Sequence, residues 1–370
     1  MTGNHPVRIG IQQRVLPSYR IPFFDALADT CPDGVGIFAG KPRPEEALDT
    51  GAQPIKAELT CGRNIHLFSG LFYLCWQKGL MEWLQNWRPD VLIMEANPRY
   101  LLSRRAINWM REQGGSVIGW GLGSPTPAGI TSAIRLKTRR HFIRQFDVLI
   151  TYSQAGAAEY ASLGFPKERI FTAPNAVAPR PVHSLPLRPE RYKAGRPVIL
   201  FVGRLQARKR ADILIRACST LPAASRPLLW IVGDGPLRRT LEDLASSVFP
   251  ETRFYGAQHG ADLENLLREA DLFVLPGTGG LAVQQAMSFG LPVIVGEADG
   301  TQSDLVRLEN GWRITDMTVE HLSQLLFSAL QDIKRLREMG EASYDIVKNE
   351  INLENMVAAF WNAIQKATDL

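Results

Sequence analysis

Short apolar runs alternate along the chain with longer segments in which apolar residues recur at helical spacing. A helix is expected near Pro22, because a proline in the first turn of a helix costs no hydrogen bond. The residues from Gln12 to Arg20 are expected to form the loop before it. In the first half, strand-like runs lie at 7–11, 90–94, 116–120, 148–153 and 169–177. This alternation predicts parallel sheets covered by helices, the α/β class.

A second series of strand-like runs begins after a segment rich in proline and arginine. Such a segment is typical of a linker, and 370 residues are too many for one ordinary core. The chain is therefore predicted to have an N-terminal domain, a linker, a C-terminal domain and a final helical segment, at 1–180, 181–197, 198–345 and 346–370. The final helix must pack on another element, because one of its faces carries Met356, Val357, Phe360 and Ile364.

Composition limits the class of protein. Hydrophobic residues make up 45% and charged residues 21% of the chain, a balance typical of globular proteins. The cysteines are scattered without metal-ligand spacing, which argues against a metal site or a disulfide framework and suits a reducing compartment. With no apolar signal core and no run of roughly 20 apolar residues, the expected location is the cytoplasm.

Charge adds a second constraint. The net charge is +5, and the segment 134–145 carries several arginines, a lysine and no acidic residue. One interpretation is a solvated helix face. The others are contact with an anionic membrane surface or with a phosphorylated acceptor. Nucleic acid is not expected as a partner, because no recognition motif and no aromatic stacking platform is present.

Two cations follow the first strand of the second series. Arg204 and Lys209 stand on a turn and at the following helix start, so both can converge on one dianion such as a diphosphate. The simpler interpretation is a solvated basic turn, with Gly203 serving only to close the strand.

Glycine-rich turns follow two further strands. Amides at Gly279, Gly280 and Leu281 open a helix, where they can bind phosphate oxygens, although a plain tight loop is the alternative. Gly233 and Gly235 are expected mainly to form a turn, at the same predicted edge of the sheet.

In their fixed order these motifs resemble those of a known family. The chain resembles the retaining glycosyltransferases of the GT-B fold, in particular the family 4 type, also called glycosyl transferases group 1. The resemblance is most specific from Val198 to Asn310, where it includes the run from Ala270 to Pro276 and the run from Gly280 to Ile294. It implies two Rossmann-like, doubly wound parallel-sheet domains facing a cleft, with a C-terminal helix returning to the N-terminal domain.

The resemblance also implies an activity. A hexose would pass, with retention, from a nucleoside diphosphate sugar to a glycan or lipid-linked acceptor, in polysaccharide or glycolipid biosynthesis. Arg204 and Lys209 would stabilise the leaving diphosphate, so that neither a metal nor another cofactor is expected. The donor would also contact the C-terminal domain at Gly203, Gly233, Gly235, Gly279, Gly280, Leu281 and Gln285.

The chain departs from the family pattern at several positions. The family's paired glutamates fall on Gly277 and Gln285, and its usual histidine falls on Leu122. Side chains of the N-terminal domain could compensate and bind the acceptor or the sugar, namely Arg14, Arg20, Glu95, Asn97 and Arg99. A turn salt bridge or an exposed loop is the alternative role for these residues.

Other interpretations follow from the same departures. A catalytically inactive family member would bind a nucleotide or a partner glycosyltransferase. A sugar-nucleotide epimerase needs cleft carboxylates, and a dinucleotide-dependent dehydrogenase needs a glycine fingerprint that the first strand lacks. The aromatic-rich segment 71–87 is predicted to be mostly helix core, and its alternative role is contact with a lipid acceptor.

Overall fold

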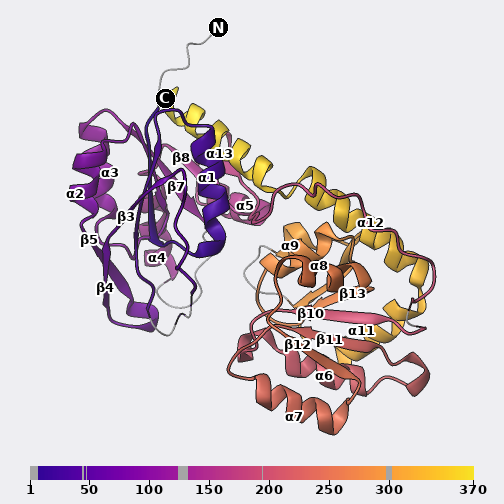
Figure 1. The fold of residues 1–370 in the computed structure, drawn as a ribbon. Helices are drawn as coiled ribbons and strands as arrows, with labels where there is room; N and C mark the ends of the chain where they lie inside the picture. The colour runs from indigo at the N-terminus through magenta and orange to yellow at the C-terminus, as the bar shows by residue number, and fades with distance from the viewer. Residues whose placement is uncertain (1–6, 44–45, 47, 124–131, 194, 297–301) are drawn as a thin grey trace. The chain divides into compact units, whose positions relative to one another are not determined.

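The computed structural model describes residues 7–370 except 44–45, 47, 124–131, 194 and 297–301. The chain divides into two compact units (Figure 1), the first made of residues 1–177 and 353–370 and the second of residues 178–352. The second unit thus includes the proline-rich segment, and the helix that joins the first unit begins at Leu353. No helix in the described ranges combines the length and the apolar character needed to cross a bilayer.

The first unit is built on a parallel sheet with strand order β3-β2-β1-β6-β7-β8-β9. Its strands are β1 (Ile9–Val15), β2 (Val35–Gly40), β3 (Glu58–Cys61), β6 (Val91–Glu95), β7 (Ser116–Gly121), β8 (Val148–Thr151) and β9 (Ile170–Thr172). Its helices are α1 (Ile21–Asp29), α2 (Leu80–Trp87), α3 (Ser103–Glu112), α4 (Ser132–Ile143), α5 (Gln154–Ser162) and α13 (Leu353–Thr368). An antiparallel hairpin, β4 (Arg63–Leu67) with β5 (Leu74–Lys78), stands beside this sheet.

The second unit repeats the design with the order β12-β11-β10-β13-β14-β15, again parallel. Its strands are β10 (Val198–Val202), β11 (Leu228–Val232), β12 (Thr252–Gly256), β13 (Leu272–Leu275), β14 (Val293–Gly296) and β15 (Gly311–Ile314). Its helices are α6 (Ala211–Ser219), α7 (Arg238–Val248), α8 (Gly260–Glu269), α9 (Leu281–Ser288), α10 (Gln302–Leu305), α11 (Val319–Gln331) and α12 (Ile333–Asn349).

Strand order reverses once in each sheet, between β1 and β6 and between β10 and β13. Chain connections leave such a point in opposite directions, so a crevice opens at the carboxyl ends of the strands. Each unit therefore has its own natural position for a ligand.

The last helix completes the core of the first unit. Helix α13 packs beside α1 and against β7, β8 and β9 (Figure 1). The ring of Phe360 lies 4.8 Å from that of Phe23 and 4.9 Å from that of Trp120, centroid to centroid. The apolar face seen in the sequence is thus buried on residues far away along the chain.

Two local predictions are wrong. Gln12, Gln13 and Arg14 lie in β1 rather than in a loop, because Gln12 and Gln13 pair with β2 and because the Gln12 side chain and the Gln13 carbonyl oxygen are bonded to the hairpin. Within the aromatic-rich segment, only 80–87 is α-helical. Residues 74–78 form a strand, because each pairs with a residue of β4.

Candidate active site

In the second unit, glycine turns at the ends of β10 and β11 pack on each other. A Cβ on Gly233 would lie 2.0 Å from the carbonyl oxygen of Gly203, and one on Gly235 would lie 2.4 Å from that of Leu205. Both glycines also have positive φ, +134° and +156°, which disfavours any side chain there. The turns line a cavity of about 510 Å³, and the exposed Arg204 lies on its wall.

Lys209 lies behind these turns. Its Nζ donates a hydrogen bond of 2.6 Å to the carbonyl oxygen of Thr278. Burial, and then the charge of Arg208, lower the pKa of Lys209 to about 8. The lysine is therefore still mostly cationic at neutral pH, but its charge lacks a carboxylate partner among the described residues.

The loop 277–280 packs directly on the segment that carries Lys209. The amide of Thr278 donates to the carbonyl oxygen of Arg208 at 3.0 Å, and the Arg208 guanidinium donates to the Thr278 hydroxyl at 3.1 Å. A Cβ on Gly277 would lie 2.1 Å from that same carbonyl oxygen. No side chain fits at position 277 without a backbone shift.

The same loop leads into α9. Gly279 has φ +139°, and a Cβ there would lie 2.3 Å from the Lys209 Nζ. Gly280 caps the helix and Leu281 opens it, so their amides belong to the helix end that lacks intrahelical acceptors. Gln285 follows one turn later and is half-buried. Structure thus brings Lys209, the glycine loop and the Gly203 turn together.

In the first unit, a cavity of about 610 Å³ lies where β1, β6, β7 and β8 end. Four of the predicted acceptor residues line it, namely Arg14, Glu95, Asn97 and Arg99. Arg20 does not line the cavity. Its buried guanidinium stacks instead on Tyr19, Trp120 and Tyr152, three residues that do.

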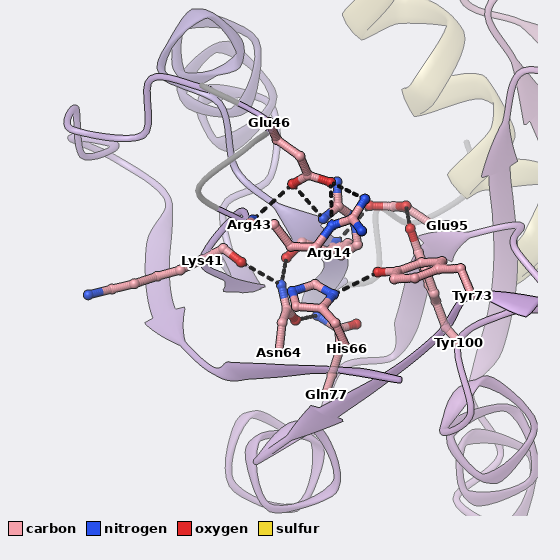
Figure 2. A network of polar contacts seen from close by, with 10 residues as sticks. All are labelled: Arg14, Lys41, Arg43, Glu46, Asn64, His66, Tyr73, Gln77, Glu95 and Tyr100. Carbon is pink, nitrogen blue, oxygen red and sulfur yellow. Dashed lines mark hydrogen bonds and ion pairs between the residues drawn. The ribbon is translucent and has the colours of Figure 1, made fainter. Parts of the chain in front are cut away.

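Glu95 is the buried carboxylate of this cavity (Figure 2). It accepts a 2.6 Å hydrogen bond from the Arg14 amide and a 2.7 Å one from the Tyr100 hydroxyl. Burial outweighs both bonds and raises the pKa of Glu95 above its usual range. Burial and the neighbouring carboxylate raise the pKa of Tyr100 as well, so its hydroxyl stays a donor.

Arg14 is held on its other side by an acidic residue. Its guanidinium pairs with Glu46 at 2.9 Å, and Glu46 also pairs with Arg43 at 3.3 Å (Figure 2). Burial opposes ionisation of Glu46, but the bonds from both arginines lower its pKa. This wall of the cavity is therefore an ion-pair network. Arg14 both forms a salt bridge and lines the cavity, so the two roles that the sequence left open for it occur together.

The hairpin supplies functional candidates that the sequence did not indicate. Gln77 accepts a hydrogen bond from Gln12 and donates to the carbonyl oxygen of Gln13 at 3.0 Å. Asn64 donates to the carbonyl oxygen of Arg14 at 2.7 Å, and His66 is bonded to the Tyr73 hydroxyl at 2.9 Å. The sequence signal that could have indicated these residues is the alternation of polar and apolar positions within 64–66 and within 75–77.

Comparison with known proteins finds a family pattern that matches most of the second unit. The sequence pattern described as "Glycosyl transferases group 1" matches residues 187–346. A GDP-mannose-dependent monoacylated alpha-(1-6)-phosphatidylinositol monomannoside mannosyltransferase of Corynebacterium glutamicum is 35% identical over 181 residues, 46% of this chain and 47% of that protein. A GDP-mannose-dependent alpha-(1-6)-phosphatidylinositol monomannoside mannosyltransferase of Mycolicibacterium smegmatis is 28% identical over 62% of each chain. The matches thus span less than two thirds of these relatives.

Solved structures cover nearly the whole chain. Anabaena Alr3699/HepE in complex with UDP superposes with a TM-score of 0.69 at 15% identity, over 97% of this chain and 99% of that one. The apo form of the lipopolysaccharide outer core galactosyltransferase WaaB gives 0.66 at 15% identity, over 96% and 99%. The family match covers residues 187–346, less than half of the chain, and the whole chain has the GT-B fold of two Rossmann-like parallel-sheet domains.

Proposed function

We propose that the protein is a retaining hexosyltransferase that moves a hexose from a nucleoside diphosphate sugar to a glycan or lipid-linked acceptor. The observation that carries the proposal is the packing of the 277–280 loop on Lys209. Relatives that match the same segment are GDP-mannose-dependent transferases, and a structural neighbour was solved with UDP.

The donor diphosphate would lie against the glycine turns of the second unit. Lys209 would supply a point charge and Arg204 a bidentate fork, so that negative charge developing on the leaving diphosphate is stabilised without a metal. Amides of Gly279, Gly280 and Leu281 would donate to its oxygens, and backbone at Gly203, Gly233 and Gly235 permits close approach. Gln285 would hydrogen-bond a ribose hydroxyl.

The acceptor would occupy the cavity of the first unit. Arg14, Asn97 and Arg99 would bind its polar groups, while Glu95 holds the Arg14 backbone and the Tyr100 hydroxyl in place. Arg20 would act from behind, by positioning the rings of Tyr19 and Tyr152. Retention fits this arrangement, because in a front-face transfer the leaving phosphate oxygen itself takes the acceptor proton.

One observation favours a second candidate function, a catalytically inactive member that binds a nucleotide or a partner glycosyltransferase. Resemblance places a glutamate at position 277, and the backbone of Arg208 leaves no room for one. A site without this carboxylate could bind a donor and not use it. Consumption of the donor, by transfer or hydrolysis, separates the two functions.

A peripheral location is part of the proposal. On α4 the side chains of Lys137 and Arg140 are exposed, as is Arg144 just after the helix, whereas Phe142 and Ile143 are buried in the first unit. The basic face would contact anionic lipids at the inner surface of the membrane, with the protein in the cytoplasm.

Thermal unfolding with nucleotides tests the donor site. UDP, GDP, ADP and dTDP and their sugar conjugates are added without metal, and a ligand of the folded state raises the melting temperature. Stabilisation by one base is expected in the wild type and not in Lys209→Ala. If no nucleotide stabilises the wild type, the transferase proposal fails. A strict manganese requirement for turnover would contradict the roles of Arg204 and Lys209.

A further inference from the structure

The β4–β5 hairpin has inverted polarity. Side chains alternate between the two faces of a strand, so Ile65, Leu67, Leu74 and Trp76 share one face of the hairpin and Asn64, His66, Cys75 and Gln77 the other. The polar face is turned inward, where Gln77 is 2% exposed, and the apolar face is turned outward, where Trp76 is 42% exposed. A hairpin of a water-exposed sheet normally has the opposite arrangement.

Hydrogen bonds fix this register. Figure 2 shows Asn64 directed towards Arg14 and His66 towards Tyr73, with Gln77 beside Asn64. The bonds of Gln77 to β1 hold β5 in place. A slip by one residue would bury the apolar set and break these bonds. Exposure of the apolar face is therefore specified by the structure.

The turn of the hairpin extends the apolar surface. Phe68 is 73% exposed and Phe72 is 79% exposed. Phe68 also has φ +59°, a conformation that is rare for a bulky residue and is often retained where it serves a ligand. These residues, with Ser69, Tyr73, Leu74 and Arg99, line a cavity of about 710 Å³.

Arg99 lines this apolar cavity and also the polar acceptor cavity. The two cavities therefore share one arginine. Glu46 is engaged by Arg14 and Arg43, and Glu95 by Tyr100 and the Arg14 amide. In the described part of the chain no carboxylate pairs with the side chain of Arg99, which is exposed, so its charge is available to an anionic ligand.

We infer that the acceptor is a phosphate-linked lipid, whose apolar chain lies on the hairpin face and whose phosphate is bound by Arg99. This inference rests on the proposed function and narrows its acceptor class. Arginine suits a phosphate because its fork offers parallel donors, and the apolar chain explains why an exposed hydrophobic patch ends at a polar cavity. The headgroup beyond the phosphate lies in the cavity of Glu95 and Asn97.

Binding of farnesyl phosphate to the full chain, below its micelle concentration, tests the inference by calorimetry. Farnesol and inorganic phosphate serve as the comparison ligands. Farnesyl phosphate is expected to bind about tenfold more tightly than farnesol, and Phe72→Ser to lower its affinity about tenfold. Arg99→Gln is expected to lower the affinity for farnesyl phosphate about tenfold and to leave that for farnesol unchanged.

Matched variants in the second unit are Phe327→Ser and Arg313→Gln, both at exposed positions, and these should bind farnesyl phosphate as the wild type does. Equal affinity for farnesyl phosphate and farnesol, or wild-type affinity in Phe72→Ser, would overturn the inference. So would sedimentation with vesicles of phosphatidylcholine and phosphatidylglycerol without binding of monomeric farnesyl phosphate, because the face would then be a membrane anchor. Nucleotide stabilisation, measured on the same samples, reports separately on the donor site.

Discussion

At the edge of β10, β11 and β13 the candidate site is mostly backbone, whereas at the edge of β1, β6 and β7 it is mostly side chain. Glycines at 233, 235, 277 and 279 let turns and a lysine approach within distances that a Cβ would forbid. Arginines, a buried glutamate and tyrosines make the other edge. The same sheet design thus presents an edge lined by backbone in one unit and an edge lined by side chains in the other.

The backbone site should be the more sensitive to loss of its one buried cation. Lys209→Ala is expected to lower kcat/KM about 100- to 1000-fold, the usual loss on removing one preorganised donor to a developing charge. Steady-state kinetics with the donor identified by thermal unfolding would measure it. Lys193→Ala, which removes an exposed lysine paired with Glu269, is the control. Activity within threefold of the wild type would remove Lys209 from the mechanism.

Placing a glutamate at position 277, where the family pattern has one, should destabilise the protein. In Gly277→Glu, the new Cβ meets the backbone of Arg208 and Lys209, so the loop must shift. Overpacking of this kind costs about 1–3 kcal/mol of unfolding free energy. A lower melting temperature and loss of nucleotide stabilisation are expected, with Gly51→Ala as the control at an exposed loop. A gain of activity would show that position 277 tolerates the carboxylate.

The site in the first unit, which is built mostly from side chains, should lose less activity from a single substitution. Glu95→Gln keeps an oxygen for the Arg14 amide or the Tyr100 hydroxyl but removes the charge. Transfer is expected to fall about tenfold, because the cavity wall is less well positioned, with nucleotide stabilisation unchanged. Rates at saturating donor, beside those of the exposed-site variant Glu112→Gln, measure the effect. Equal rates in the two variants would confine Glu95 to a structural role.

The smallest expected effect is a dependence of nucleotide affinity on pH. Since burial lowers the pKa of Lys209 to about 8, the folded protein loses this charge as pH rises through about 8, and in the window between that pKa and the higher pKa of the unfolded chain only the unfolded chain keeps it. The penalty for burying the cation is present below pH 8 and is relieved above it, so this group adds stability as pH rises through that window. Nucleotide affinity should fall over the same range.

Titration calorimetry of the nucleotide at several pH values would show this fall. Lys209→Arg keeps its charge throughout the range and should flatten the profile. Parallel profiles in the wild type and the arginine variant would mean that another group controls the pH dependence.

The contrast between the two edges also explains what the sequence could predict. Gly233, Gly235 and Gly279 are required by local backbone geometry, so their spacing after apolar strands is visible in one sequence. Strand β1 was predicted too short and β5 was taken for helix, because Gln12, Gln13 and Gln77 are buried polar residues. The side chains of Gln12 and Gln77 are bonded to each other across a long stretch of sequence, and no local pattern records such a partner.

Completion of the first unit by α13 bears on the order in which the chain folds during synthesis. Residues 1–177 leave the ribosome long before Phe360, and until then Phe23 and Trp120 lack the contact with its ring. The second unit, continuous in sequence from 178 to 352, can fold in the interval. The domain that is translated first is thus the one that becomes native last.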